Sequence, residues 1–127
     1  MIKRLIASIV VLILASPADA QQVGLKRTPL QTVDFPDKYS TVSVIAELAP
    51  GVSAGHHNHP GAETGYVLEG EYDLMIDGMP VQHLQAGNSW QIAAGIPHDL
   101  KNTGNQPLKI LVVYVVEKGK PLASPVP

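Results

Sequence analysis

Apolar and polar residues alternate along much of this chain with a period of two. In residues 41–48 every second residue from Val42 to Leu48 is apolar, and polar Ser43 and Glu47 lie between them. A strand that buries only one of its faces shows this alternation. Further short strands are predicted at residues 28–33, 52–59, 63–68, 72–76, 80–85, 89–92, 100–103 and 108–116.

Glycine and proline separate these segments. The chain has 11 of each among 127 residues, and Asp77-Gly78 between two alternating segments is typical of a hairpin turn. Beyond residue 20 no segment repeats apolar residues with the 3.6-residue period of a helix. Many short strands joined by frequent turns predict an all-β sandwich or barrel, and the length suits a single domain.

The segments flanking the predicted barrel differ in character. Residues 108–116 are apolar almost throughout, which predicts a strand buried on both faces, between sheets or at a subunit interface. Residues 21–40 are polar and predict an arm with an edge strand. The barrel itself is predicted at residues 41–117. Residues 118–127 contain three prolines, and we expect a loose tail there.

The first 20 residues have the composition of a secretory signal peptide. Lys3 and Arg4 precede an apolar run at residues 5–15, and small residues lead to a predicted cleavage site after Ala20. An uncleaved anchor is the alternative, but the run is shorter than the ~20 residues that a spanning helix needs. We therefore expect a periplasmic or secreted protein of 107 residues without a membrane span.

Cleavage leaves seven basic and ten acidic residues and a net charge of −3. No basic patch is present, so the sequence argues against a nucleic-acid partner. The mature chain is only marginally large enough for a stable core of its own, so we expect a homodimer.

Residues 51–70 contain a candidate metal site. His57 and His59 are two residues apart in a predicted strand and so project from the same face, and Glu63 follows four residues later. A predicted loop then brings in His98. The chain has no cysteine, so the metal would be bound by imidazole and carboxylate, and Fe, Mn, Ni, Cu or Zn would fit such a set.

The other two histidines are weaker candidates. His56 alternates to the opposite face from His57, so we expect it to point away from the metal. His83 is alone in its predicted strand, where a histidine is most often solvated or hydrogen-bonded.

Two motifs of this chain resemble the signature motifs of the cupin superfamily. The first reads Gly51-x5-His57-x-His59-x3-Glu63-x6-Gly70, and every fixed position is matched. The second reads Gly87-x5-Ala93-x-Gly95-x2-His98-x3-Asn102, with Ala93 where the family usually has proline. The resemblance implies a jelly-roll barrel, often dimeric, with one divalent metal held by His57, His59, Glu63 and His98. The loss of proline affects the stiffness of the loop rather than the ligand at His98.

Several functions are compatible with such a site. A quercetinase-like dioxygenase would act on a small substrate that chelates the metal, with Glu63 as ligand and possible base. A metal-assisted isomerase or lyase would use the same site, and a non-catalytic module would only bind a small ligand or metal. The only arginine of the mature chain, Arg27, lies outside the motifs, which favours an apolar or chelating ligand over a sugar phosphate.

Overall fold

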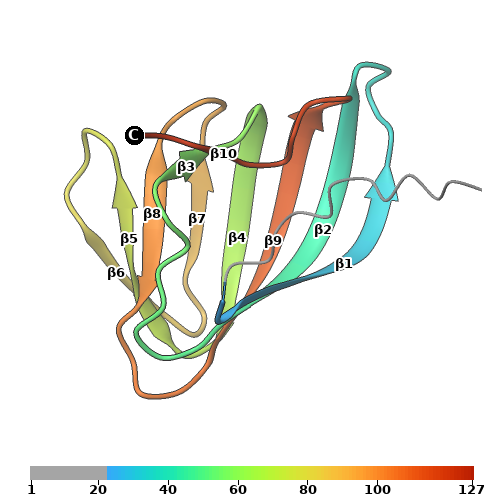
Figure 1. Cartoon of the computed structure of the whole chain (residues 1–127). Helices are drawn as coiled ribbons and strands as arrows, with labels where there is room; N and C mark the ends of the chain where they lie inside the picture. Colours follow the sequence, from blue (N-terminus) through green and yellow to red (C-terminus); the bar gives the residue numbers. More distant parts are fainter. Residues whose placement is uncertain (1–22) are drawn as a thin grey trace, which may run out of the picture.

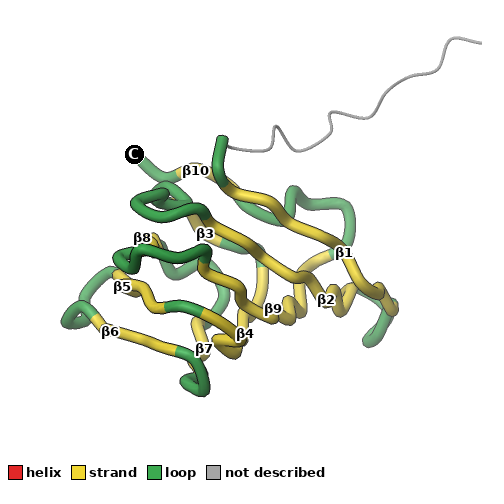
Figure 2. The backbone as a smooth tube through the Cα atoms, turned by 90° about the horizontal axis from the view of Figure 1, so that it is seen from below, coloured by secondary structure: helices red, strands yellow, loops and turns green. Residues whose placement is uncertain are grey.

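The computed structural model describes residues 23–127, which form ten strands and no helix. The signal peptide predicted at residues 1–20 lies outside the described residues. Figure 1 shows the strands arranged as two sheets, and Figure 2 shows them joined by loops. The predicted all-β fold is confirmed. No helix long and apolar enough to cross a lipid bilayer occurs among residues 23–127.

Each sheet has five strands, and all neighbouring strands are antiparallel. The first sheet has the order β1 (Leu25–Val33), β2 (Tyr39–Leu48), β9 (Leu108–Glu117), β4 (Gly61–Glu69) and β7 (Ser89–Ile92). The second has the order β10 (Ser124–Pro125), β3 (His57–Asn58), β8 (His98–Asn102), β5 (Glu71–Ile76) and β6 (Gln82–Gln85).

The chain passes repeatedly from one sheet to the other. Strands β3, β4 and β5 lie in alternate sheets, as do β7, β8, β9 and β10. This is the winding of a double-stranded β-helix, the jelly-roll barrel that the motifs implied. The facing sides of the two sheets bury an apolar core: Leu25, Val44, Ala46, Leu48, Val67, Tyr72, Leu74, Ile76, Trp90, Ile92, Leu100, Leu108, Ile110, Val112, Tyr114 and Val116.

Strict alternation along β4 places one carboxylate inside this barrel. Gly61, Glu63, Gly65 and Val67 face the interior, while the residues between them are exposed. Gly65 provides room for the indole of Trp90, because a Cβ at position 65 would lie 1.9 Å from that ring. The strand therefore brings Glu63 to the interior beside a closely packed aromatic side chain.

Three predictions about local structure differ from what is observed. The strand expected at residues 52–59 is reduced to β3, because Gly55 has a φ of 85° and bends the chain before His57. Within the chain, strand β9 is buried on one face only, so it does not lie between two sheets, and burial of its other face at a subunit interface stays a prediction. The tail after residue 118, expected to be loose, contributes β10 and pairs with β3.

Candidate metal centre

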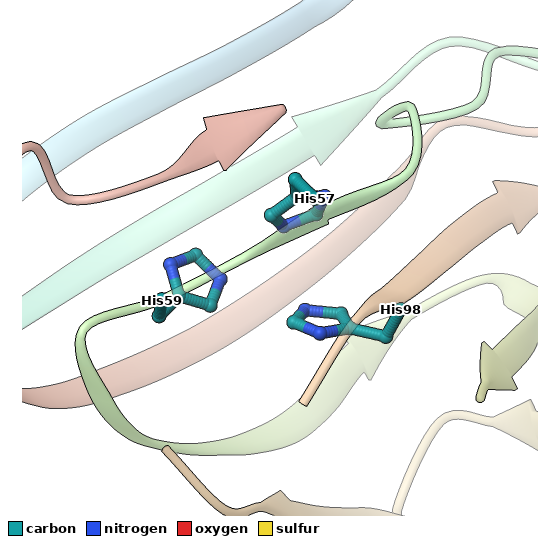
Figure 3. A group of neighbouring side chains, drawn as sticks. All are labelled: His57, His59 and His98. Atoms are coloured by element: carbon teal, nitrogen blue, oxygen red, sulfur yellow. The ribbon is translucent and has the colours of Figure 1, made fainter. Parts of the chain in front are cut away.

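Three buried histidines converge between the two sheets. His57 on β3 is paired directly with His98 at the start of β8, and His59 follows two residues after His57. Their ring centroids are 4.4–5.2 Å apart, and one ligand atom from each lies within 4.8 Å of the others. Figure 3 shows the three rings gathered in one place from these separate segments. They are therefore close enough together to bind one metal ion.

Glu63 approaches this cluster from the opposite sheet. Its Oε2 lies 3.0 Å from His98 Nε2 and 3.4 Å from His59 Nε2, and its side chain is 4% exposed. The structure thus brings together all four residues of the candidate ligand set. His56 instead pairs with Asp77 at 3.1 Å at the surface, and His83, whose side chain is 82% exposed, pairs with Asp73.

A backbone carbonyl fixes the tautomer of each histidine in the cluster. The Nδ1 atoms of His57 and His98 contact the carbonyls of Gly55 at 2.6 Å and Ile96 at 2.9 Å. His59 Nδ1 contacts the carbonyl of Leu122 at 2.6 Å. A carbonyl oxygen only accepts, so Nδ1 must donate in all three rings. In a neutral imidazole the lone pair then resides on Nε2.

The buried Nε2 atoms and the Glu63 carboxylate need a proton or a metal cation between them. His59 Nε2, His98 Nε2 and Glu63 Oε2 are buried and face one another at 3.0–3.4 Å across the carboxylate. Three electron pairs that face one another repel unless a proton or a metal cation lies between them. Imidazole nitrogens with a carboxylate oxygen suit a divalent transition metal, so the donor set fits such an ion.

The pKa values describe the cluster when it holds no metal. Burial lowers the pKa of His57 to about 4, so this ring is neutral. Burial alone would raise the pKa of Glu63, but the adjacent His59 and His98 outweigh it and lower that pKa to about 2. Burial disfavours the charged form of His98, yet Glu63 and the Ile96 carbonyl raise its pKa above the usual value. In the metal-free protein the Glu63 carboxylate therefore favours the protonated form of His98.

Two further polar residues border the cluster: Tyr114, which the sequence did not single out, and Arg27, which was expected to lie away from the site. The Tyr114 ring lies 4.7 Å from that of His59, and its hydroxyl interacts with Arg27 and Glu63. Burial and the nearby carboxylate of Glu63 raise the pKa of Tyr114, which keeps this hydroxyl protonated. Alternation along β9 could have placed Tyr114 inside, but the segment was interpreted as uniformly apolar.

Arg27 faces the interior of the barrel from the edge strand. It pairs with buried Ala46 on β2, whereas its neighbour Lys26 pairs on the outer face with Glu47. Arg27 is half-buried and so retains access to solvent. Because Arg27 is far in sequence from both motifs, the sequence did not indicate that it lies near the site.

The sequence family of this chain agrees with the fold and the cluster. The family described as Cupin domain (Cupin_2) matches residues 44–114, which include all four candidate ligands. The chain belongs to this cupin family.

The similar curated proteins are longer than this cupin. It is 38% identical over 87 residues to the HTH-type transcriptional regulator PuuR of Escherichia coli K12, and equally to that of Shigella flexneri. The match covers 67% of this chain and 46% of each regulator. The chain thus spans about half the length of these relatives.

Solved structures show the same fold at low sequence identity. An uncharacterised double-stranded β-helix protein of Klebsiella pneumoniae has a TM-score of 0.66 and 24% identity, covering 86% of this chain and 90% of that protein. DMSP lyase DddQ of Ruegeria pomeroyi has a TM-score of 0.70 and 20% identity, covering 88% of this chain and 57% of that enzyme. Bacillus subtilis oxalate decarboxylase, studied for its Mn(II) centres, has a TM-score of 0.60 and 22% identity, covering 68% of this chain and 24% of that enzyme.

Proposed function

We propose that this cupin binds one divalent transition metal through His57, His59, Glu63 and His98. The observation that carries the proposal is the convergence of three buried histidines and the buried Glu63 carboxylate, whose Oε2 lies 3.0 Å from His98 Nε2 and 3.4 Å from His59 Nε2. Two imidazoles come from β3 and the residues after it, one from β8, and the carboxylate from the facing sheet, so these ligands would surround the ion from several sides. Mn, Fe, Ni, Cu and Zn all accept such ligands, and the identity of the metal needs measurement.

We propose that the site acts on a small substrate that chelates the metal through oxygen. A metal bound here would act as a Lewis acid or support oxygen chemistry at positions that the protein leaves open. The Tyr114 hydroxyl, protonated and beside Glu63, can donate a hydrogen bond to a substrate oxygen. Glu63 serves chiefly as a ligand, because a carboxylate with a pKa of about 2 is a weak base until it moves away from His59 and His98.

The first activity that we propose to test is that of a quercetinase-like dioxygenase. The experiment is elemental analysis of the mature protein purified from its own compartment, followed by oxygen uptake with a flavonol and with a β-diketone. We expect one metal ion per chain and substrate-dependent oxygen consumption. A protein that carries no metal after growth in metal-replete medium would contradict the metal site. A metal-loaded protein that consumes no oxygen with either substrate would contradict the dioxygenase.

Two other functions have specific support. Metal-assisted lyase chemistry is favoured by the fold shared with DMSP lyase and with the Mn(II)-containing oxalate decarboxylase. A non-catalytic ligand-binding module is favoured by the similarity to half of a transcriptional regulator. Mass spectrometry of a co-purified ligand before and after incubation with metal and oxygen separates these cases, because only a binding module leaves the ligand unchanged.

Arg27 favours a substrate that carries an anionic group. A guanidinium inside the barrel can pair with a carboxylate while another oxygen of the same molecule reaches the metal. In the metal-loaded protein we expect Arg27→Gln to weaken the binding of malonate by about 10-fold or more, since hydrogen bonds to charged groups contribute about 1.5–3 kcal/mol. Calorimetry with malonate and neutral malonamide measures the effect. Lys26→Gln, on the outer face, is the matched control, and equal affinities in both variants would refute this role.

We further propose export and a homodimer. The composition of residues 1–20 supports export, and N-terminal sequencing of the mature protein should begin at Gln21. The outer face of β9 and β4 carries Val113 and Val115 beside Ala62, which would suit contact with a second copy. Sedimentation of the purified protein should give twice the mass of the chain, and a monomer would exclude the dimer.

A further inference from the structure

The three histidines of the cluster obtain their Nδ1 acceptors in two different ways. His57 and His98 each use the carbonyl two residues earlier in the chain, at Gly55 and Ile96. His59 uses the carbonyl of Leu122, which is 63 residues away. The local arrangements form whenever their own loops form. The orientation of His59 depends on where the C-terminal segment lies.

This segment crosses from one sheet to the other. Figure 1 shows it leaving the end of β9 and running to β3, beside which it forms β10. Hydrogen bonds fix both of its ends: Lys118 N donates to the Lys38 carbonyl at 3.0 Å, and Val126 N donates to the His56 carbonyl at 3.0 Å. Between these points the side chain of Leu122 packs against the buried core.

Apart from the C-terminal segment, β3 and His59 are held by β8 and by the loop at Gly95, whose N donates to the His59 carbonyl at 2.9 Å. Strand β3 consists of two residues, and its pairing with β8 is limited to His57 opposite His98. On its other side, Asn58 and His57 are paired with Ser124 and Pro125 of β10. The C-terminal segment therefore supports both the strand that carries His57 and the ring of His59.

We infer that residues 121–126 form a strap that positions His59 and thereby sets how tightly the site holds its metal. This inference rests on the proposed metal site. The Leu122 carbonyl holds the Nδ1 proton of His59, so that the lone pair of Nε2 points toward His98 and Glu63. Residues that orient a metal ligand in this way typically contribute 10- to 100-fold to metal affinity. Leu122 is thus a positioning residue that acts through its backbone.

The test compares two truncated chains with the full protein. A chain that ends at Lys120 loses the Leu122 carbonyl, β10 and the hydrogen bond from Val126 N, whereas a chain that ends at Ala123 loses β10 and the Val126 bond but keeps the Leu122 carbonyl. A chain that ends at Val126 retains every contact described for the strap and is the control. Two readouts are used: Zn²⁺ affinity by chelator competition, and long-range ¹H–¹⁵N spectra of the imidazoles in the metal-free protein.

We expect the chain ending at Lys120 to bind Zn²⁺ about 10- to 100-fold more weakly. Its His59 should lose the single tautomer with the proton on Nδ1, while His57, which is neutral and bonded to the Gly55 carbonyl, retains that tautomer and is the internal control. The chain ending at Ala123 should keep the His59 tautomer and lose less affinity. Unchanged affinity and an unchanged His59 tautomer in the chain ending at Lys120 would overturn the strap.

Two further outcomes are distinguishable. If the chain ending at Lys120 does not fold, Leu122→Ala replaces it, because loss of the packed side chain should free the carbonyl and mix the His59 tautomers. An unmixed tautomer in that variant would overturn the inference. If the full-length protein binds no Zn²⁺, the proposed metal site is refuted. The imidazole spectra of the metal-free protein then still show whether the strap orients His59.

Discussion

Replacing His98 with alanine is expected to abolish stoichiometric metal binding. His98 is 1% exposed, is paired directly with His57 across β3 and β8, and lies 3.0 Å from Glu63. The substitution removes one of the converging nitrogens and leaves a cavity that solvent or a neighbouring side chain can fill. Metal affinity should fall by more than the 10- to 100-fold decrease that follows when a residue that only supports a metal ligand is removed.

The measurement is metal content after dialysis, together with Zn²⁺ or Mn²⁺ affinity by competition. His83→Ala is the matched control, because it removes a histidine that is paired with Asp73 at the surface and does not touch the cluster. Circular dichroism establishes that both variants fold. Full occupancy in a folded His98→Ala protein would mean that the metal is held elsewhere or by fewer residues than we propose.

The sequence predicts most of this fold because the barrel depends on local patterns. Alternation in residues 41–48 and 72–76 identified β2 and β5, since each strand buries one face against the opposite sheet. Asp77-Gly78 marked the hairpin between β5 and β6, where Gly78 has a φ of 79°. The spacing of the histidines and the two motifs brought His57, His59, Glu63 and His98 into one hypothesis.

The remaining features depend on contacts between segments that are far apart in sequence. The acceptor for His59 is a backbone carbonyl, and a carbonyl is present at every residue, so nothing in the sequence marks that of Leu122. The prolines of the tail predicted a loose segment, although a two-residue edge pairing tolerates proline where no N–H is needed. Arg27 approaches the site only because β1 pairs with β2 in one particular register. An apolar sequence does not show what covers each face of a strand: burial of β9 between two sheets was wrong, whereas burial of its outer face at a subunit interface stays a prediction.

The proton on His98 makes metal binding depend on pH. Glu63, with a pKa of about 2, stays ionised at every working pH, whereas burial lowers the pKa of His98 but the Glu63 carboxylate outweighs burial and raises that pKa above its usual value. A metal must displace that proton, so the apparent affinity of the intact protein should rise with pH. The rise should level off only above the raised pKa of His98, when no proton competes.

Glu63→Gln should weaken metal binding and also change this pH dependence. The amide carries no charge, so the ion loses its only anionic ligand, and we expect a loss of about 10-fold or more at pH 8. Without the carboxylate, burial lowers the pKa of His98, so affinity should level off at a lower pH than in the intact protein. The deficit of the variant should therefore shrink from pH 8 to pH 6. Zn²⁺ competition across this range measures both effects, with Glu69→Gln, exposed on the same strand, as control.

Parallel curves of affinity against pH for Glu63→Gln and the intact protein would show that Glu63 does not hold the His98 proton. Coincident curves would exclude Glu63 from the ligand set as well, because a carboxylate that binds the ion cannot lose its charge without loss of affinity.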